Sequence, residues 1–169
     1  MNKQVVYFSD NFFSTGYTDI FSHEQEKIGS LDLKSPFKEG VDVIDLSGNV
    51  LVRGKFPFMS NKWIVLAREE TIIGELKESF AFFSKNYHYK AVDKGVYKIH
   101  SPAFSKQYEI RDDRNKPVAY FKKVNSFFEN PSFQLINYSN TIPAFEWIVV
   151  IMGIHAIQKR RRSAAASMM

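Results

Sequence analysis

The four histidines are the first residues to test for chemistry, because imidazole serves as a general base and as a metal ligand. They lie at positions 23, 88, 100 and 155. No two have the HxxxH spacing that places two ligands on one helix face, and none lies in a His–carboxylate cluster at ligand spacing. The sequence has no cysteine, which excludes thiolate ligands and disulfides. We predict no metal site and expect His155, in an apolar segment, to be a hydrogen-bonded core residue.

Two groups of carboxylates invite a functional interpretation. Glu146 lies in the same apolar segment as His155, but on a helix the two would be about 13 Å apart, too far to pair directly. We expect Glu146 to be solvated or paired with Lys or Arg. Asp112, Asp113 and Asn115 lack the alternating ligands and distal Glu of an EF-hand, which indicates a solvated turn. GxSxG and P-loop motifs are absent too. We therefore predict no catalytic residues, no cofactor and no enzymatic activity.

The run Lys159-Arg160-Arg161-Arg162 is the clearest chemical signal in the sequence. The net charge is +5, and without these four residues the rest of the chain carries only +1. Each such charge near an anionic leaflet contributes about 1 kcal/mol to binding. Four charges give weak peripheral binding, and stable anchoring also requires an apolar partner. A solvated flank that complements the helix dipole is the alternative interpretation.

Outside this run, Lys122 and Lys123 form the one other adjacent basic pair. Nucleic-acid binding requires basic residues clustered on the fold and interleaved with aromatics, so we predict no nucleic-acid partner. Aromatic groups such as Phe80–Phe83 and Phe127-Phe128 are expected to pack in a core or at a rim. We retain Lys122 and Lys123 as candidates that assist the basic run.

The elements that must position these residues are mostly short strands. Residues 17–138 alternate apolar or aromatic runs with polar turns, and the clearest hairpin is residues 41–56, with Ser47-Gly48-Asn49 as its turn. Similar turns are expected at residues 68–70, 93–95 and 112–116. So many strands in succession indicate a meander, and a closed antiparallel barrel avoids exposed edges.

Residues 142–157 differ, because they are apolar on all sides. They predict a helix over about 142–158, capped by Asn140-Thr141 with Pro143 in its first turn. A transmembrane span requires about 20 apolar residues, and this segment is shorter and contains Glu146 and His155. A short tail anchor and a buried strand remain alternatives. An all-apolar helix in a globular chain with 44% hydrophobic residues is expected in the core.

This layout resembles the tubby C-terminal-like superfamily, and within it the LURP-one-related and phospholipid-scramblase-like proteins. Three segments carry the resemblance: residues 41–56, 108–124 and 142–157. It implies a mainly β fold, a closed antiparallel barrel of about twelve strands threaded by a buried hydrophobic C-terminal helix. Tubby domains bind phosphoinositide head groups through basic surface residues, but no position here matches that site convincingly.

We expect one domain over residues 1–162, including the core helix, and a flexible tail over 163–169. The expected function is a non-enzymatic binding or scaffold module, cytoplasmic and peripheral to membranes. It would contact anionic phospholipid through Lys159, Arg160, Arg161 and Arg162, assisted by Lys122 and Lys123. The alternatives are a tail-anchored membrane protein with a cytosolic β-domain, and a small-ligand carrier with a site at the barrel mouth. No protein partner is indicated.

Overall fold

The computed structural model describes residues 3–9, 16–33, 40–79, 85–102, 105–127 and 130–169. Within them the chain forms strands and then one helix, α1 (Ala144–Ser167). The strands are β1 (Gln4–Ser9), β2 (Gly16–Ser22), β3 (Lys27–Leu33), β4 (Gly40–Ile44), β5 (Val50–Lys55), β6 (Trp63–Ala67), β7 (Ile72–Ser79), β8 (Lys85–Ala91), β9 (Gly95–Ser101), β10 (Tyr108–Arg111), β11 (Pro117–Phe127) and β12 (Asn130–Asn137).

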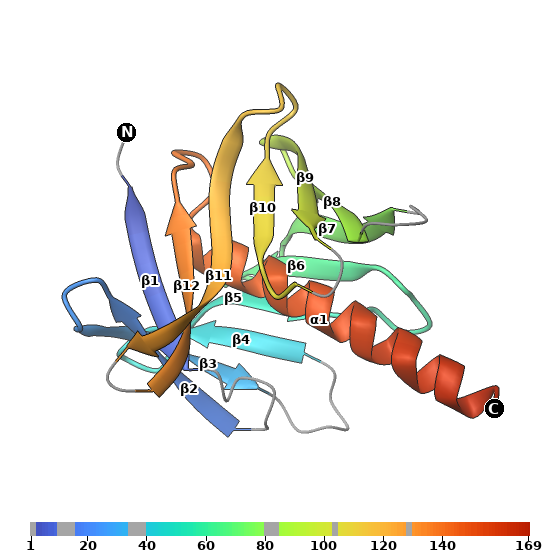
Figure 1. Ribbon diagram of the computed structural model, residues 1–169, viewed down its shortest axis with the longest axis horizontal. Coiled ribbons are helices and arrows are strands. Elements are labelled where there is room, and N and C mark those ends of the chain that lie inside the picture. The colour runs from blue at the N-terminus through green and yellow to red at the C-terminus, as the bar shows by residue number, and fades with distance from the viewer. Residues whose placement is uncertain (1–2, 10–15, 34–39, 80–84, 103–104, 128–129) are drawn as a thin grey trace.

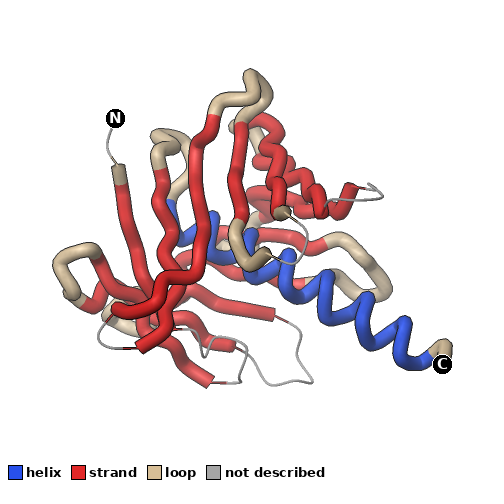
Figure 2. Tube along the Cα trace, viewed as in Figure 1, coloured by secondary structure: helices blue, strands red, loops and turns tan. Residues whose placement is uncertain are grey.

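The strands form one closed antiparallel barrel in which every strand pairs with its neighbours in sequence. The barrel closes where β1 pairs with β12, from Gln4 opposite Asn137 to Ser9 opposite Ser132. Helix α1 passes between the strands and leaves the barrel at one side (Figures 1 and 2). The predicted fold, a twelve-strand barrel with a buried C-terminal helix, is therefore confirmed over the described residues.

Short polar turns connect the strands at one end of the barrel. Asp45 shows how they are stabilised: its Oδ1 accepts hydrogen bonds from the backbone N–H groups of Ser47 and Asn49, both at 2.8 Å. Gly48 and Gly95 have φ angles of 84° and 102°, which favour glycine. The turns predicted at residues 47–49, 68–70, 93–95 and 112–116 all join paired strands.

The helix supplies the core that a barrel of this size needs. Side chains alone fill a barrel of about eight strands, and a wider one holds a cavity or another element. A helix with its side chains is about 10 Å across and fills that space. Accordingly, α1 is buried on all sides from Glu146 to Ile154.

The helix is longer than predicted. It begins at Ala144 and ends at Ser167, whereas the sequence predicted an end near residue 158 and a tail over 163–169. Residues 163–167 continue the helix with exposed side chains. Ala164, Ala165 and Ala166 favour this extension, because alanine has the highest intrinsic helix propensity.

Trp63 of β6 binds the helix to the barrel wall through a hydrogen bond and close packing. Its indole Nε1 donates a hydrogen bond to the backbone oxygen of Val149 at 3.2 Å. Two glycines make room for the ring. A Cβ on Gly54 of β5 would lie 2.4 Å from the indole, and one on Gly153 of α1 would lie 2.3 Å from it. The glycine in the middle of the helix is therefore a packing requirement.

Gly153→Ala is expected to destabilise the protein, although alanine normally stabilises a helix interior by about 1 kcal/mol. The added methyl group collides with Trp63, and overpacking of a core costs about 1–3 kcal/mol. Urea unfolding followed by tryptophan fluorescence measures the sign. Ser163→Ala, on the exposed part of the same helix, is the control and should be neutral or slightly stabilising. A Gly153→Ala variant with increased stability would contradict the packing argument.

Candidate functional site

Helix α1 begins at one end of the barrel and leaves the barrel at the other. The end at which it begins, here called the turn end, is formed by residues 23–26, 45–49, 68–71, 92–94 and 112–116. At the other end α1 leaves the barrel beside the β5–β6 loop, residues 56–62; this is called the exit end. Each candidate site residue on the helix belongs to one of these ends.

Glu146 is the buried acid at the turn end. Its side chain is 1% exposed; its Oε1 accepts a hydrogen bond from the Tyr89 hydroxyl at 2.6 Å, and its Oε2 one from Lys94 Nζ at 3.2 Å. Burial raises the pKa of Tyr89, and the Glu146 carboxylate raises it further, so the hydroxyl stays a donor. The predicted pairing with a basic residue is confirmed, but Glu146 is buried and not solvated.

The start of α1 is held by neighbouring side chains and not by the predicted cap. Pro143 is the N-cap residue, and no side chain caps the helix there. Instead, Trp147 Nε1 donates to Asn137 Oδ1 at 3.1 Å, and Asn137 Nδ2 donates to the Ile142 oxygen at 2.9 Å. The Thr141 hydroxyl instead lies 3.2 Å from the hydroxyl of Tyr97 in β9. The Asn140-Thr141 cap was therefore predicted wrongly.

At the exit end, two of the four predicted basic residues are held against the barrel. Arg160 donates a hydrogen bond to the Ser60 backbone oxygen at 2.8 Å, and its guanidinium lies 3.5 Å above the centre of the Phe56 ring. Arg161 forms an ion pair with Glu78 at the end of β7. These contacts fix the direction in which the basic segment leaves the barrel.

Three cations of this end, Lys106, Arg162 and Lys85, lie close enough to His155 to act on its charge. Burial, together with the positive charges of these three residues, lowers the pKa of His155 to about 3. The imidazole is therefore neutral at physiological pH and packs edge-on against the Tyr108 ring, at 5.8 Å between centroids. Lys159 and Arg162 themselves are exposed on the helix.

The β5–β6 loop ends in an apolar tip that the sequence analysis did not single out. Its base is packed, since Phe56 contacts Trp63 edge-on at 5.1 Å. Its tip is not, since Phe58 is 94% exposed and Met59 is 92% exposed. The run Phe56-Pro57-Phe58-Met59 is apolar throughout, so the sequence alone gives no signal that its second half faces solvent.

Lys122 and Lys123 do not join the basic segment. Both are exposed on β11, opposite Gln134 and Phe133 of β12. Arg160 and Arg161 contact the β5–β6 loop and β7, and in the barrel order β8, β9 and β10 lie between β7 and β11. The structure thus separates the two groups of predicted site residues.

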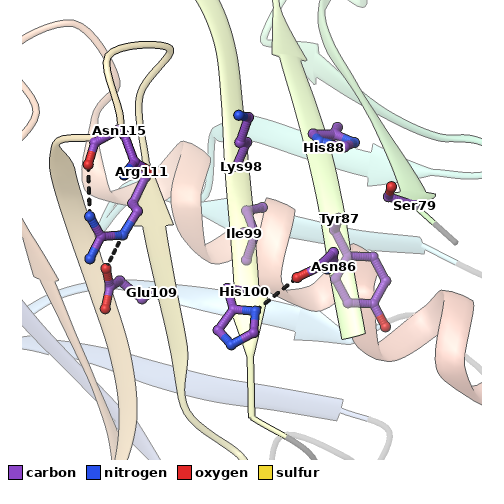
Figure 3. A pocket seen from close by; sticks show the side chains of 10 residues that line it. All are labelled: Ser79, Asn86, Tyr87, His88, Lys98, Ile99, His100, Glu109, Arg111 and Asn115. Carbon is purple, nitrogen blue, oxygen red and sulfur yellow. Dashed lines mark hydrogen bonds and ion pairs between the residues drawn. The ribbon is translucent and has the colours of Figure 1, made fainter. Parts of the chain in front are cut away.

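A second candidate is a hollow of about 470 Å³ on the outer face of β7–β10 (Figure 3). The strand register aligns His88, Lys98 and Arg111 in one row across three strands. Such a row offers nitrogen donors to an anion. The alternation of His88 with Lys90 and of Lys98 with His100 hinted at one outward face, but only the register shows which residues meet.

Two donors that line this hollow, Arg111 and His100, already have protein partners. Arg111 forms an ion pair with Glu109 and donates to the Asn115 backbone oxygen at 2.7 Å. His100 Nδ1 lies 2.8 Å from Asn86 Oδ1 (Figure 3). The acid and the internal hydrogen bonds reduce the attraction for an anion, so the exit end is the stronger candidate.

The predicted solvated turn at Asp112 is present. Asp112 Oδ1 accepts hydrogen bonds from the backbone N–H groups of Arg114 at 3.0 Å and Lys116 at 2.8 Å, and Asn115 has a φ of 64°. Phe127 stacks on Tyr7 with ring centroids 4.0 Å apart, which agrees with a packing role. Phe80–Phe83 and Phe128 lie outside the described residues.

Among the described segments, none of the helical structure has both the length and the apolar composition that crossing a bilayer demands. The apolar segment proposed as a possible tail anchor instead forms the interior of the barrel.

The sequence matches no family model and no curated protein. The fold defines a class, closed antiparallel barrels of twelve strands with a helix inside, and a solved structure shares it. This is the X-ray structure of the Arabidopsis thaliana protein AT5G01750, which superposes with a TM-score of 0.63 over 90% of each chain at 11% sequence identity. At this identity the similarity concerns the fold alone.

Proposed function

We propose that this protein is a non-enzymatic module of the tubby-like, LURP-one-related kind that binds anionic phospholipid surfaces with its exit end. The superfamily proposal is supported by the barrel with its internal helix and by the similarity in fold to AT5G01750. The lipid proposal rests on a different observation, the distribution of charge along the barrel.

The observation that carries the proposal is the concentration of cations where the helix leaves the barrel. Among the described residues, Lys159–Arg162 lie there with Lys62, Lys85 and Lys106, and Arg161 pairs with the acid Glu78. The turn end instead mixes acids and bases, including Glu24, Glu26, Asp45, Asp93, Asp112 and Asp113 beside Lys94, Arg114 and Lys116. A surface of negative phospholipid head groups therefore attracts the exit end and orients the barrel.

Replacing Lys159 and Arg162 together by glutamine is expected to weaken binding to phosphatidylserine-containing vesicles about 30-fold. Each charge contributes about 1 kcal/mol to the binding free energy, and two such contributions are lost. These two are chosen because Arg160 and Arg161 also contact the barrel. Co-sedimentation over a lipid titration measures the change. Wild-type binding should also fall as salt rises from about 0.1 to 0.5 M, since exposed charges are screened.

The matched control is Lys122→Gln with Lys123→Gln, which removes the same charge from β11. It should weaken binding much less, because Lys122 and Lys123 lie in the middle of β11, and β8, β9 and β10 separate β11 from the β7 strand that Arg161 contacts. Equal losses in the two double variants would mean that attraction is general and not localised. Absence of wild-type binding to anionic vesicles would refute the lipid proposal altogether.

A further inference from the structure

We infer that Phe58 and Met59 form a wedge that inserts between the lipids of an anionic membrane beside the basic end of α1. The inference rests on the proposed function and adds its missing component, an apolar anchor. Charge alone gives weak, reversible attachment, and stable peripheral binding combines a basic segment with buried apolar groups. The sequence supplies the first, and the folded β5–β6 loop supplies the second.

The position of the tip supports this role. The hydrogen bond from Arg160 to the Ser60 oxygen, at 2.8 Å, ties the loop directly to the basic segment. Arg160 also lies over the Phe56 ring, and Phe56 packs on Trp63. The base of the loop is thus packed against the barrel and α1. In Figure 1 the β5–β6 loop and the last turns of α1 project from the same side of the barrel. A membrane that meets the cations also meets the tip.

Neither the local backbone preference nor burial favours a large apolar residue at Met59. The Ser60 N–H donates to the Pro57 oxygen at 3.1 Å, which closes a four-residue turn whose third residue, Met59, has a φ of 54°. That left-handed position favours glycine or asparagine. A large apolar side chain there is disfavoured locally and gains nothing from burial, since Met59 is 92% exposed. Such a residue is suited to an apolar environment outside the protein.

The first experiment separates lipid insertion from stability. Phe58→Ser with Met59→Asn keeps a residue that tolerates the left-handed conformation, so the melting temperature should stay the same or rise. Binding to vesicles of phosphatidylcholine and phosphatidylserine should weaken about tenfold or more, because burial of two large apolar side chains is lost. Leu46→Ser is the control, since Leu46 is 68% exposed but lies in a turn-end loop; its binding should not change.

The second experiment locates the tip directly. The native tryptophans, Trp63 and Trp147, are buried, so a tryptophan introduced by Phe58→Trp reports on the loop. On addition of the same vesicles its emission should shift to the blue and be quenched by brominated acyl chains. A tryptophan introduced by Leu46→Trp should show neither change.

The outcomes distinguish this inference from the proposed function. If the wild-type protein binds the vesicles but the Phe58→Ser, Met59→Asn variant binds equally well, the wedge is refuted and the charge-based proposal stands. If the tryptophan at position 58 stays unquenched while the protein is bound, the wedge is refuted as well. If the wild-type protein does not bind, both fall. Weakened binding of the double variant with quenching at position 58 establishes insertion.

Discussion

A chain that ends at Pro143, without α1, is expected not to fold. The deletion removes Trp147, Ile148, Ile151 and Ile154, which are fully buried, and leaves a barrel whose apolar inner face borders a space about 10 Å wide. Buried apolar surface contributes about 25 cal/mol per Å² to stability, and here the helix is the main partner of that surface. Circular dichroism and proton NMR should show loss of cooperative unfolding and of dispersed signals.

Deletion of residues 163–169 is the matched control, because this part of α1 and the residues after it are exposed. It should leave the melting temperature unchanged within a few degrees. A folded, monomeric 1–143 fragment would contradict the barrel-core assignment. That outcome is also the one required by the tail-anchor alternative, in which the β-domain folds without the apolar segment, so the experiment decides between the two.

Glu146→Ala is expected to cost about 3–5 kcal/mol, the usual result of removing one partner from a buried ion pair. The substitution leaves the buried Tyr89 hydroxyl and the Lys94 ammonium without their acceptor. Glu146→Gln keeps an oxygen for Tyr89 and should cost less. Lys94→Met should cost less again, since the Lys94 side chain is 34% exposed and its charge is partly screened. Urea denaturation followed by tryptophan fluorescence provides the measurement.

Glu78→Gln is the control for the Glu146 series, since Glu78 forms its ion pair with Arg161 at the protein surface. Exposed pairs contribute about 0–1 kcal/mol, so this variant should unfold close to the wild type. Equal effects of Glu146→Ala and Glu78→Gln would mean that the turn-end network does not hold the helix.

The hairpins were predictable because they depend on neighbouring residues. Gly48 and Gly95 mark turns whose backbone requires a positive φ, and the apolar runs beside them alternate with period two. The helix inside the barrel was predictable for another reason, since residues 142–157 have no polar face and must be covered. Its end was missed because the prediction followed the apolar pattern, which stops near residue 158, and gave no weight to the high helix propensity of Ala164–Ala166.

The long-range pairs could not be predicted. Asp42 alternates with the apolar residues Val41 and Val43, a pattern typical of a solvent-facing position, yet it is buried under Arg53, which donates to both of its oxygens at 2.6 and 2.9 Å. Register places these two side chains opposite each other. Glu146 and Lys94 are joined in the same way, by an approach of two distant segments.

The basic run could be singled out from the sequence, whereas the apolar tip could not. Lys159–Arg162 could be singled out as a candidate site because they supply four of the five net positive charges of the chain. Phe58 and Met59 could not, because an apolar residue counts as core until a structure shows it in solvent. The hydrogen bond between Arg160 and Ser60 spans 100 positions of sequence, and together with the contact of Arg160 with the Phe56 ring it joins the basic run to the loop.

The position of α1 after β12 has a consequence for biosynthesis. The segment that fills the barrel leaves the ribosome after all the strands that surround it, and β1 must wait for β12 before the wall can close. The nascent strands therefore lack their interior partner throughout translation. Contacts so distant in sequence slow folding, and exposed apolar strands invite aggregation in the meantime. We expect new chains to depend on chaperones until the last segment has emerged.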